Sequence, residues 1–409
     1  MARSGSLRTA RDPAANVWPS PGSSLPRPCR LSVAVEDERD QLVQRFASAI
    51  LIAMGRGMEA KALAQQTPES TNVMSAQAVS LTRYLLGHEA KNPELGSEFC
   101  HFMAQLAFAA KIMAHEVMRA RLIGKLGLAG ERNASGDAQK MLDVFTNDTM
   151  IAAFARTGLV AEIVSEELEV PKRVPGGADA RFVLCTDPLD GSANTDTNGP
   201  VGTIFSLYRR REGTPRVDLR QVPYRGSEQV AAGYVMYGPS TLLVYTSCAG
   251  VNGFTLDPSV GEFLLSHADI RCPVRGTCVS ANLAHLRHWH PNVQTYVESL
   301  SADESSMGRP RSFRYTGAFV ADLHRVLISG GIFFYPGDRE HPMGKLRLLY
   351  ECAPLALLVE QAGGSASDGQ RRILDIETQD IHQRTPIAIG SAEDVASFET
   401  FFKQDRAVA

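Results

Sequence analysis

The sequence has few cysteines, no marked excess of charge and no long apolar segment. Its seven cysteines are scattered and form no Cys-x-x-Cys pair, which argues against a disulfide framework and indicates reduced thiols. The formal net charge of −3 gives no reason to expect nucleic acid or an anionic membrane as a partner. The apolar run at 46–54 is too short to cross a bilayer. We therefore expect a soluble, cytoplasmic protein.

What is present fits a globular chain of one to three domains. The 409 residues are 44% hydrophobic and 21% charged, which is ordinary for such proteins. Residues 1–73 differ from the rest, because 1–31 is rich in Arg, Ser and Pro with Asp12 as its only acid. Three interpretations stay open for this part: a disordered extension, an organellar transit peptide, or an upstream start where translation begins at Met74. A short helix is expected within 37–66.

Hydrophobic periodicity predicts helices around a sheet. From Phe99 to Val117, apolar residues recur at i, i+3, i+4 and i+7, which is typical of one buried helix face. Short apolar runs between glycines and prolines indicate an antiparallel or mixed sheet. We expect helices at 80–86, 99–117, 141–154, 314–326 and 354–361, strands at 163–164, 181–186, 201–208, 229–237, 242–245 and 330–335, and a strand or tight turn at 345–351.

The stretch Arg181–Asn194, RFVLCTDPLDGSAN, carries the most informative chemistry. Its first six residues predict a buried strand, which Asp187-Pro-Leu-Asp190-Gly then breaks, leaving two carboxylates three residues apart. The small residues that follow have amides suited to a nest for an anion. Taken alone, the pattern fits an Asx-rich turn equally well.

Acids also end apolar segments elsewhere, so that four separated places offer carboxylates: Asp143, Glu166 with Glu167, Asp187 with Asp190, and Glu351. Buried like charges would protonate unless a cation neutralised them. With oxygen-only ligands, the natural choices are Mg²⁺ and Mn²⁺, and two such ions can polarise a phosphoryl oxygen. An unligated carboxylate can then take the proton of the attacking water. Surface salt bridges remain the alternative for any one of these acids.

Basic and hydroxyl side chains outside the acid cluster complete the candidates. Lys345, Arg314, Tyr315 and Tyr335 are available to bind a sugar phosphate. The histidines at 285, 288 and 290 suggest zinc at first sight. No acid or cysteine lies at a finger-like spacing from them, so zinc is not the favoured interpretation.

Nine short motifs occur in one order: VSEE, DPLDGSAN, VGTIF, RYTG, ADLHR, GGIFFYP, GKLRLLYE, AGG and DIHQR. Over about Ser80 to Phe402 they resemble class I fructose-1,6-bisphosphatase, a family that shares its metal-phosphatase core with inositol monophosphatases. The resemblance implies an α/β (α+β layered) fold with two mixed-sheet parts. It implies a phosphatase domain with the metal site at 74–265, a domain completing the sugar-phosphate site at 266–409, and a homotetramer.

The resemblance also implies a role for each matching residue. The metal ligands would be Glu166, Asp187, Asp190, Glu351 and the carbonyl of Leu189, binding at least two Mg²⁺ (or Mn²⁺) ions per subunit. Glu167 and Asp143 would activate the water, and Asp137 with Asp143 would belong to a mobile loop that closes over the site. The labile phosphate would lie at Asp190, Gly191, Ser192 and Ala193. The sugar and the retained phosphate would contact Asn282, Tyr315, Tyr335 and Lys345, with Arg314 reaching across a subunit boundary.

This chain departs from the family pattern at several positions. Ala193 stands where a second serine is usual, so we expect weaker phosphate binding rather than an inactive enzyme. His285 replaces a common tyrosine, which makes that phosphate contact pH-sensitive. In the regulatory pocket that animal members use for AMP, small hydroxyl residues become Gly96 and Cys100, a lysine-tyrosine pair becomes Arg181-Phe182, and Arg209 is retained. We therefore expect no AMP inhibition of the animal type.

The implied activity is Mg²⁺-dependent hydrolysis of D-fructose 1,6-bisphosphate to D-fructose 6-phosphate and phosphate, in gluconeogenesis, the Calvin cycle or both. The first alternative is sedoheptulose 1,7-bisphosphate as the main or a second substrate. A second alternative is a catalytically inactive homologue that binds a sugar phosphate without cleaving it. Against the latter, every carboxylate that the mechanism needs is present.

Overall fold

The computed structural model describes residues 78–89, 95–124, 127–132, 138–210, 224–301 and 311–404. All of them belong to one compact unit, Met74–Ala409. The expectations for 1–73, including the short helix, and for Asp137 lie outside the described residues.

The larger sheet confirms the expected mixed arrangement. Among the described residues it has eight strands in the order β10-β9-β8-β7-β6-β5-β3-β4, all antiparallel except the parallel pair β3 and β5. The strands are β3 (Val160–Ser165), β4 (Lys172–Arg173), β5 (Phe182–Asp190), β6 (Val201–Arg209), β7 (Gln229–Tyr237), β8 (Thr241–Thr246), β9 (Val251–Asp257) and β10 (Glu262–His267).

A smaller sheet follows in the chain. In the described part it has five strands in the order β12-β11-β13-β15-β14, with parallel and antiparallel pairs. They are β11 (Cys278–Ser280), β12 (Ser312–Phe313), β13 (Gly331–Tyr335), β14 (Ser365–Ser367) and β15 (Ile387–Gly390). A separate two-stranded sheet pairs β1 (Leu128–Arg132) with β2 (Ala138–Lys140).

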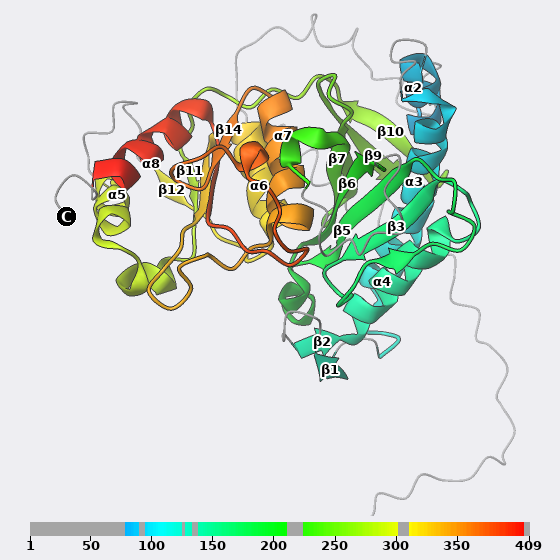
Figure 1. The fold of residues 1–409 in the computed structure, drawn as a ribbon, viewed down its shortest axis with the longest axis horizontal. Helices are drawn as coiled ribbons and strands as arrows, with labels where there is room; N and C mark the ends of the chain where they lie inside the picture. The colour runs from blue at the N-terminus through cyan, green and yellow to red at the C-terminus, as the bar shows by residue number, and fades with distance from the viewer. Residues whose placement is uncertain are drawn as a thin grey trace, which may run out of the picture. The chain divides into compact units, whose positions relative to one another are not determined.

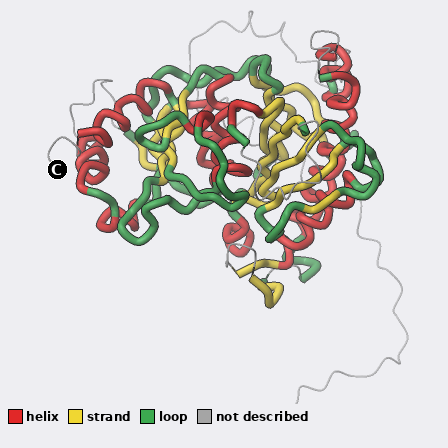
Figure 2. The backbone as a smooth tube through the Cα atoms, viewed as in Figure 1, coloured by secondary structure: helices red, strands yellow, loops and turns green. Residues whose placement is uncertain are grey.

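Helices and sheets alternate in layers, as Figure 1 shows. Helices α2 (Leu81–Glu89), α3 (Gly96–Arg119) and α4 (Met141–Phe154) contact the larger sheet. Helices α6 (Phe319–Ser329) and α7 (Ala353–Gln361) contact both sheets, and Figure 2 shows them between the two groups of strands. Helices α5 (Pro291–Ser301) and α8 (Ala392–Gln404) pack together beside the smaller sheet. Short helical turns are η1 (Ser192–Thr197), η3 (Gly226–Glu228), η4 (Leu283–His288), η5 (Leu348–Cys352) and η6 (Ile373–Asp375).

The predicted apolar stripe explains how α3 packs. Its members Phe99, Phe102, Leu106 and Met113 are each at most 2% exposed and join a core with the larger sheet. A second core is shared by both sheets, because α6 and α7 have apolar faces on two sides. It contains Ile204 of β6 and Ile389 of β15 together with residues of both helices. The apolar surface buried there holds the two sheets to one helical layer.

Two expectations near the candidate site were wrong. Residues 345–351 form neither a strand nor a tight turn, since η5 is a π-helical turn that runs directly into α7. The predicted helix at 314–326 begins only at Phe319, because Gly317 has a φ of +83°, which a right-handed helix does not allow. Both differences leave irregular backbone beside the acids, and π-helical turns of this kind are frequent at functional sites.

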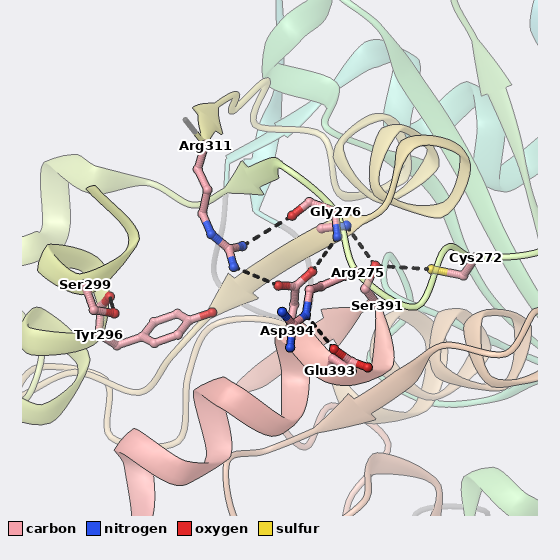
Figure 3. A network of polar contacts seen from close by, with 10 residues as sticks. Cys272, Arg275, Gly276, Tyr296, Ser299, Arg311, Ser391, Glu393 and Asp394 are labelled. Atoms are coloured by element: carbon pink, nitrogen blue, oxygen red, sulfur yellow. Dashed lines mark hydrogen bonds and ion pairs between the residues drawn. The ribbon is translucent and has the colours of Figure 1, made fainter. Parts of the chain in front are cut away.

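A buried ion pair ties α8 to the smaller sheet (Figure 3). Asp394, in the first turn of α8, is 2% exposed, and its Oδ1 lies 3.0 Å from Arg311 Nη2. Its Oδ2 accepts the N–H of Gly276 at 2.9 Å, and Arg311 Nη1 donates to the Gly276 carbonyl at 3.5 Å. Because Arg311 immediately precedes β12, the network fixes the start of this edge strand.

Candidate functional site

A β-bulge brings two acids of β5 to one side. The predicted strand does not end at Thr186 but continues to Asp190, and its ladder pairs Asp187 with Ile204 and Asp190 with Gly202. Three steps along β5 therefore oppose two along β6, which is a one-residue bulge. In a regular strand, residues three apart point to opposite faces. With the bulge, oxygens of Asp187, Asp190 and Glu351 all lie within 4.8 Å of one another.

Asp190 is held by the first turn of α6. Its Oδ1 accepts the N–H of Phe319 at 3.1 Å, and its Oδ2 accepts the N–H of Val320 at 2.7 Å. These are the unpaired amides of a helix start, where a negative charge is favoured. Gly191 follows with a φ of +74°, and a Cβ at this position would come within 2.4 Å of Ala318 Cβ. Only glycine allows the chain to pass so close to α6.

Glu351 reaches the cluster from η5. Its carboxylate accepts the backbone N–H of Arg347. Arg347 Nη2 in turn lies 3.2 Å from Oε1 of Glu166, which follows β3. Both side chains of this ion pair are largely buried. The sequence reasoning missed Arg347, although it lies within the GKLRLLYE motif, four residues before Glu351.

Burial and mutual repulsion strongly disfavour ionisation of these acids. Burial, with repulsion from Glu166, raises the pKa of Asp190 to about 7 and that of Glu351 to about 8. Burial raises the pKa of Asp187 well above its usual range, and Glu166, Asp190 and Glu351 raise it further. A bound divalent cation would favour the ionised carboxylates and so offset the cost of burying their charge. All of the candidate ligand atoms are oxygens, which hard divalent cations prefer. The residues therefore fit a hard divalent metal.

The histidines at 285, 288 and 290 do not form a comparable site. Within the described ranges, the acids Asp187, Asp190 and Glu351 bring three ligand atoms together and these histidines do not. His285 and His288 lie with ring centroids 6.3 Å apart, and His288 Nδ1 pairs with Glu340 at 3.4 Å.

Asp143 lies in the first turn of α4 and is 5% exposed. Its Oδ2 accepts the N–H of Lys140 at 2.8 Å, whereas its Oδ1 has no hydrogen-bond partner among the described residues. Burial raises the pKa of this carboxyl. Lys140 Nζ donates to the Ser192 carbonyl at 3.1 Å and to Asp196 Oδ2 at 2.7 Å. The sequence reasoning missed Lys140, which ties the start of α4 to the loop after Asp190; its place three residues before Asp143 was the available signal.

Gly191 precedes η1, and Ser192 and Ala193 are the first two residues of η1. Gly191 and Ser192 are half-buried and Ala193 is exposed. Glu167 is half-buried, and its N–H donates to Ser165 Oγ at 3.3 Å. Leu189 lies inside the bulge and is 5% exposed. Leu189 is the penultimate residue of β5, and Gly191 to Ala193 directly follow that strand.

The candidates for the sugar lie on the smaller sheet. Asn282 precedes η4, and its side chain forms a hydrogen bond that lowers the pKa of Tyr315, while burial raises that pKa to about 12. Tyr335, at the end of β13, and Asp190 are near enough to raise the pKa of Tyr315 as well. Lys345 is half-buried beside Arg347, which donates to its carbonyl at 3.4 Å. The structure thus brings Asn282, Tyr315 and Tyr335 together, and both Tyr315, 41% exposed, and Arg314 are accessible to solvent.

Comparison with known proteins decides the family. The model for the N-terminal domain of fructose-1-6-bisphosphatase matches residues 79–268, and the model for its C-terminal domain matches residues 272–403. The chain is 54% identical over 310 residues to "Fructose-1,6-bisphosphatase class 1 2" of Acaryochloris marina, covering 76% of this chain and 93% of the relative. This chain belongs to the class I fructose-1,6-bisphosphatase family.

Further relatives agree. "Fructose-1,6-bisphosphatase class 1" of Chlorobium phaeovibrioides is 46% identical over 327 residues, which is 80% of this chain and 98% of that protein. The crystal structure of Leishmania major fructose-1,6-bisphosphatase in its holo form superposes with a TM-score of 0.75 at 36% identity, over 80% of this chain and 99% of that one. The family and the α/β fold predicted from nine motifs are confirmed.

Family membership implies use of a divalent metal, and the carboxylate cluster gives it a place. None of the six cysteines in the described ranges forms a disulfide. No helix in those ranges has both the length and the apolar character needed to cross a membrane.

Proposed function

We propose that this chain hydrolyses the 1-phosphate of D-fructose 1,6-bisphosphate, giving D-fructose 6-phosphate and inorganic phosphate. Its membership of the fructose-1,6-bisphosphatase family supports this reaction. The observation that carries it here is the buried group Asp187, Asp190 and Glu351, which fits a hard cation at the end of β5. An inactive homologue would have no need to retain three buried acids of raised pKa.

The proposed metal site holds at least two Mg²⁺ ions, with Mn²⁺ as a substitute. Its ligands are Glu166, Asp187, Asp190, Glu351 and the carbonyl of Leu189. When bound, such ions polarise the phosphoryl group and offset the charge that develops on the leaving oxygen. Arg347 keeps Glu166 at the cluster, and the amides of α6 orient Asp190.

Proton transfer is assigned to acids outside the ligand set. Glu167 and Asp143 take the proton of the attacking water, since Asp143 keeps one buried oxygen without a partner in the described ranges. Asp137, outside the described residues, is proposed to act with them. Amides and hydroxyl of Gly191, Ser192 and Ala193 receive the labile phosphate next to Asp190.

The sugar and the retained phosphate are assigned to the smaller sheet. Asn282, Tyr315, Tyr335 and Lys345 bind them, and Arg314 acts from a neighbouring subunit. Residues 74–265 then carry the metal ligands other than Glu351, and 266–409 supply Glu351 and complete the sugar-phosphate site. A cytoplasmic homotetramer is proposed, whose mass light scattering would measure; the free cysteines support a reducing compartment.

The decisive experiment is phosphate release from fructose 1,6-bisphosphate with Mg²⁺, with and without EDTA. We expect release only when free Mg²⁺ is present. Glu351→Gln should raise the Mg²⁺ requirement strongly, whereas the control Glu262→Gln, at the edge strand β10, should not. Parallel kinetics on sedoheptulose 1,7-bisphosphate decide whether the seven-carbon sugar is also a substrate. Phosphate release that persists in EDTA, or none with either sugar, would contradict the proposal.

A further inference from the structure

The segment 311–318, which joins the smaller sheet to α6, is fixed at both ends. At its start, Arg311 forms the buried ion pair with Asp394 (Figure 3). Near its end, the N–H of Thr316 donates to both oxygens of Asp322, at 2.9 and 3.1 Å, and the N–H of Gly317 donates to Oδ2 at 3.2 Å. Asp322 lies on α6 and is only 1% exposed. Tyr315 therefore stands between two anchors.

Asn194 connects this segment to the loop after Asp190. Its Nδ2 donates to the carbonyl of Thr316 and to the carbonyl of Pro200, both at 3.0 Å. Its own carbonyl accepts the N–H of Gly199 at 2.8 Å, which fixes the backbone of η1 around it. One side-chain amide thus spans two segments that are 122 residues apart in the chain.

Both attachments meet at α6. The first two amides of this helix hold Asp190, and Asp322, in the same first turn, holds Thr316 and Gly317. One turn of α6 therefore fixes the positions of both Asp190 and the segment that carries Tyr315. Neither Asn194 nor Asp322 belongs to the ligand set or to the groups assigned to the substrate.

We propose that Asn194 and Asp322 are positioning residues that set the separation between the reacting-phosphate subsite and the subsite of the sugar and the retained phosphate. This inference rests on the function proposed above. A fixed separation selects among bisphosphates by the distance between their two phosphates, which the added carbon of a seven-carbon sugar lengthens, because misplacing a bound group weakens its contacts and its alignment. The pair thereby determines how strongly a six-carbon bisphosphate is distinguished from a seven-carbon one.

The test compares Asn194→Ala and Asn194→Asp with the control Asn252→Ala. Asn252 lies on strand β9 of the larger sheet and is also half-buried. Its side chain makes two hydrogen bonds, one to the Tyr84 hydroxyl and one from the N–H of Asp269. For Asn194→Ala we expect KM for fructose 1,6-bisphosphate to rise about fivefold, which corresponds to the loss of roughly one hydrogen bond. We expect kcat to stay within about twofold of the wild-type value. The ratio of kcat/KM between the fructose and sedoheptulose bisphosphates should move toward one, while the Mg²⁺ activation constant stays unchanged.

Asn194→Asp keeps the size of the side chain but turns a carboxylate toward two carbonyl groups, so its effects on KM and on the sugar ratio should exceed those of alanine. Asp322→Asn probes the other anchor and should change the same ratio. The control Asn252→Ala should lower thermal stability without moving either quantity.

Each other result overturns the inference. An active wild-type enzyme whose sugar ratio is unchanged in both Asn194 variants refutes positioning and leaves the proposed function standing. A parallel rise of KM and of the Mg²⁺ constant, matched by the control, shows a merely structural role. A wild-type enzyme inactive on both sugars overturns the proposed function and this inference with it.

Discussion

Glu166 and Arg347 form a buried ion pair, with 3.2 Å between Oε1 and Nη2. The arginine thus places a fixed positive charge beside acids that otherwise repel one another, and it does so from the turn that carries Glu351. How much this charge stabilises the folded chain depends on whether a bound divalent metal also neutralises the acids.

The first prediction concerns Arg347→Met. Removing the guanidinium leaves buried acids with less compensation, which costs several kcal/mol in comparable ion pairs. The midpoint of thermal unfolding should fall more for the metal-free enzyme than for the Mg²⁺-saturated enzyme, as scanning calorimetry can measure. The control Arg271→Met removes a pair with Asp269 whose two side chains are both exposed, and it should change both midpoints little. Equal losses with and without Mg²⁺ in Arg347→Met would speak against the shared role.

The second prediction concerns pH. The pKa is raised to about 7 for Asp190 and to about 8 for Glu351, so the folded metal-free chain binds more protons than the unfolded chain above the ordinary pKa near 4. The contribution of these two acids to the stability of the metal-free enzyme is therefore complete below about pH 4 to 5. It declines as pH rises toward about 8. Saturating Mg²⁺ should cancel the decline, because it favours the ionised acids. Denaturant melts at several pH values, with EDTA or Mg²⁺, test this; a metal-free enzyme that gains stability across this range would contradict it.

A third prediction separates the two kinds of acid. Glu167→Gln and Asp143→Asn should each lower kcat by at least about 10²-fold with the Mg²⁺ constant nearly unchanged, because they act on the proton of the water. Glu166→Gln and Asp187→Asn should instead raise the Mg²⁺ requirement. Steady-state kinetics at varied Mg²⁺ distinguish the cases. A near-normal kcat in Glu167→Gln would remove that residue from the proposed mechanism.

The fourth prediction is insensitivity to AMP. Gly96 begins α3 with a φ of +66°, and Cys100 directs its thiol to the Leu85 carbonyl at 3.6 Å. Arg181 already pairs with Glu98 at 3.2 Å, in the first turn of α3. Each hydrogen bond lost to a nucleotide phosphate costs about 1 kcal/mol or more. Activity at saturating Mg²⁺ should persist up to millimolar AMP; half-inhibition in the low micromolar range would show a working nucleotide pocket.

Residues 1–73 give the fifth prediction. They lie outside both family matches, and their sequence lacks the periodicity of a core-forming segment. A chain that begins at Met74 should retain full kcat and KM, measured beside the complete chain. Loss of folding or of activity in the shortened chain would give this part a structural role.

Motif and periodicity reasoning predicted much of this molecule from the sequence. The stripe from Phe99 predicted α3, and the acids of DPLDG and LLYE predicted the cluster that meets at β5. It misplaced the end of β5, because a bulge depends on the register with β6 rather than on local composition. Asn194 and Asp322 were missed for a similar reason: their partners lie in segments that only the fold brings near. A lone asparagine or aspartate has no periodic signal.

The helical layer between the two sheets has a consequence for how the protein unfolds. Because α6 and α7 bury apolar side chains against both sheets, separating the sheets would expose apolar residues of the core that the two sheets share. The boundary between the two family matches, near residue 270, is therefore not a boundary of stability. We therefore expect amide hydrogens of α6 and α7 to exchange with solvent only when both sheets come apart, and the two halves to melt in a single cooperative step.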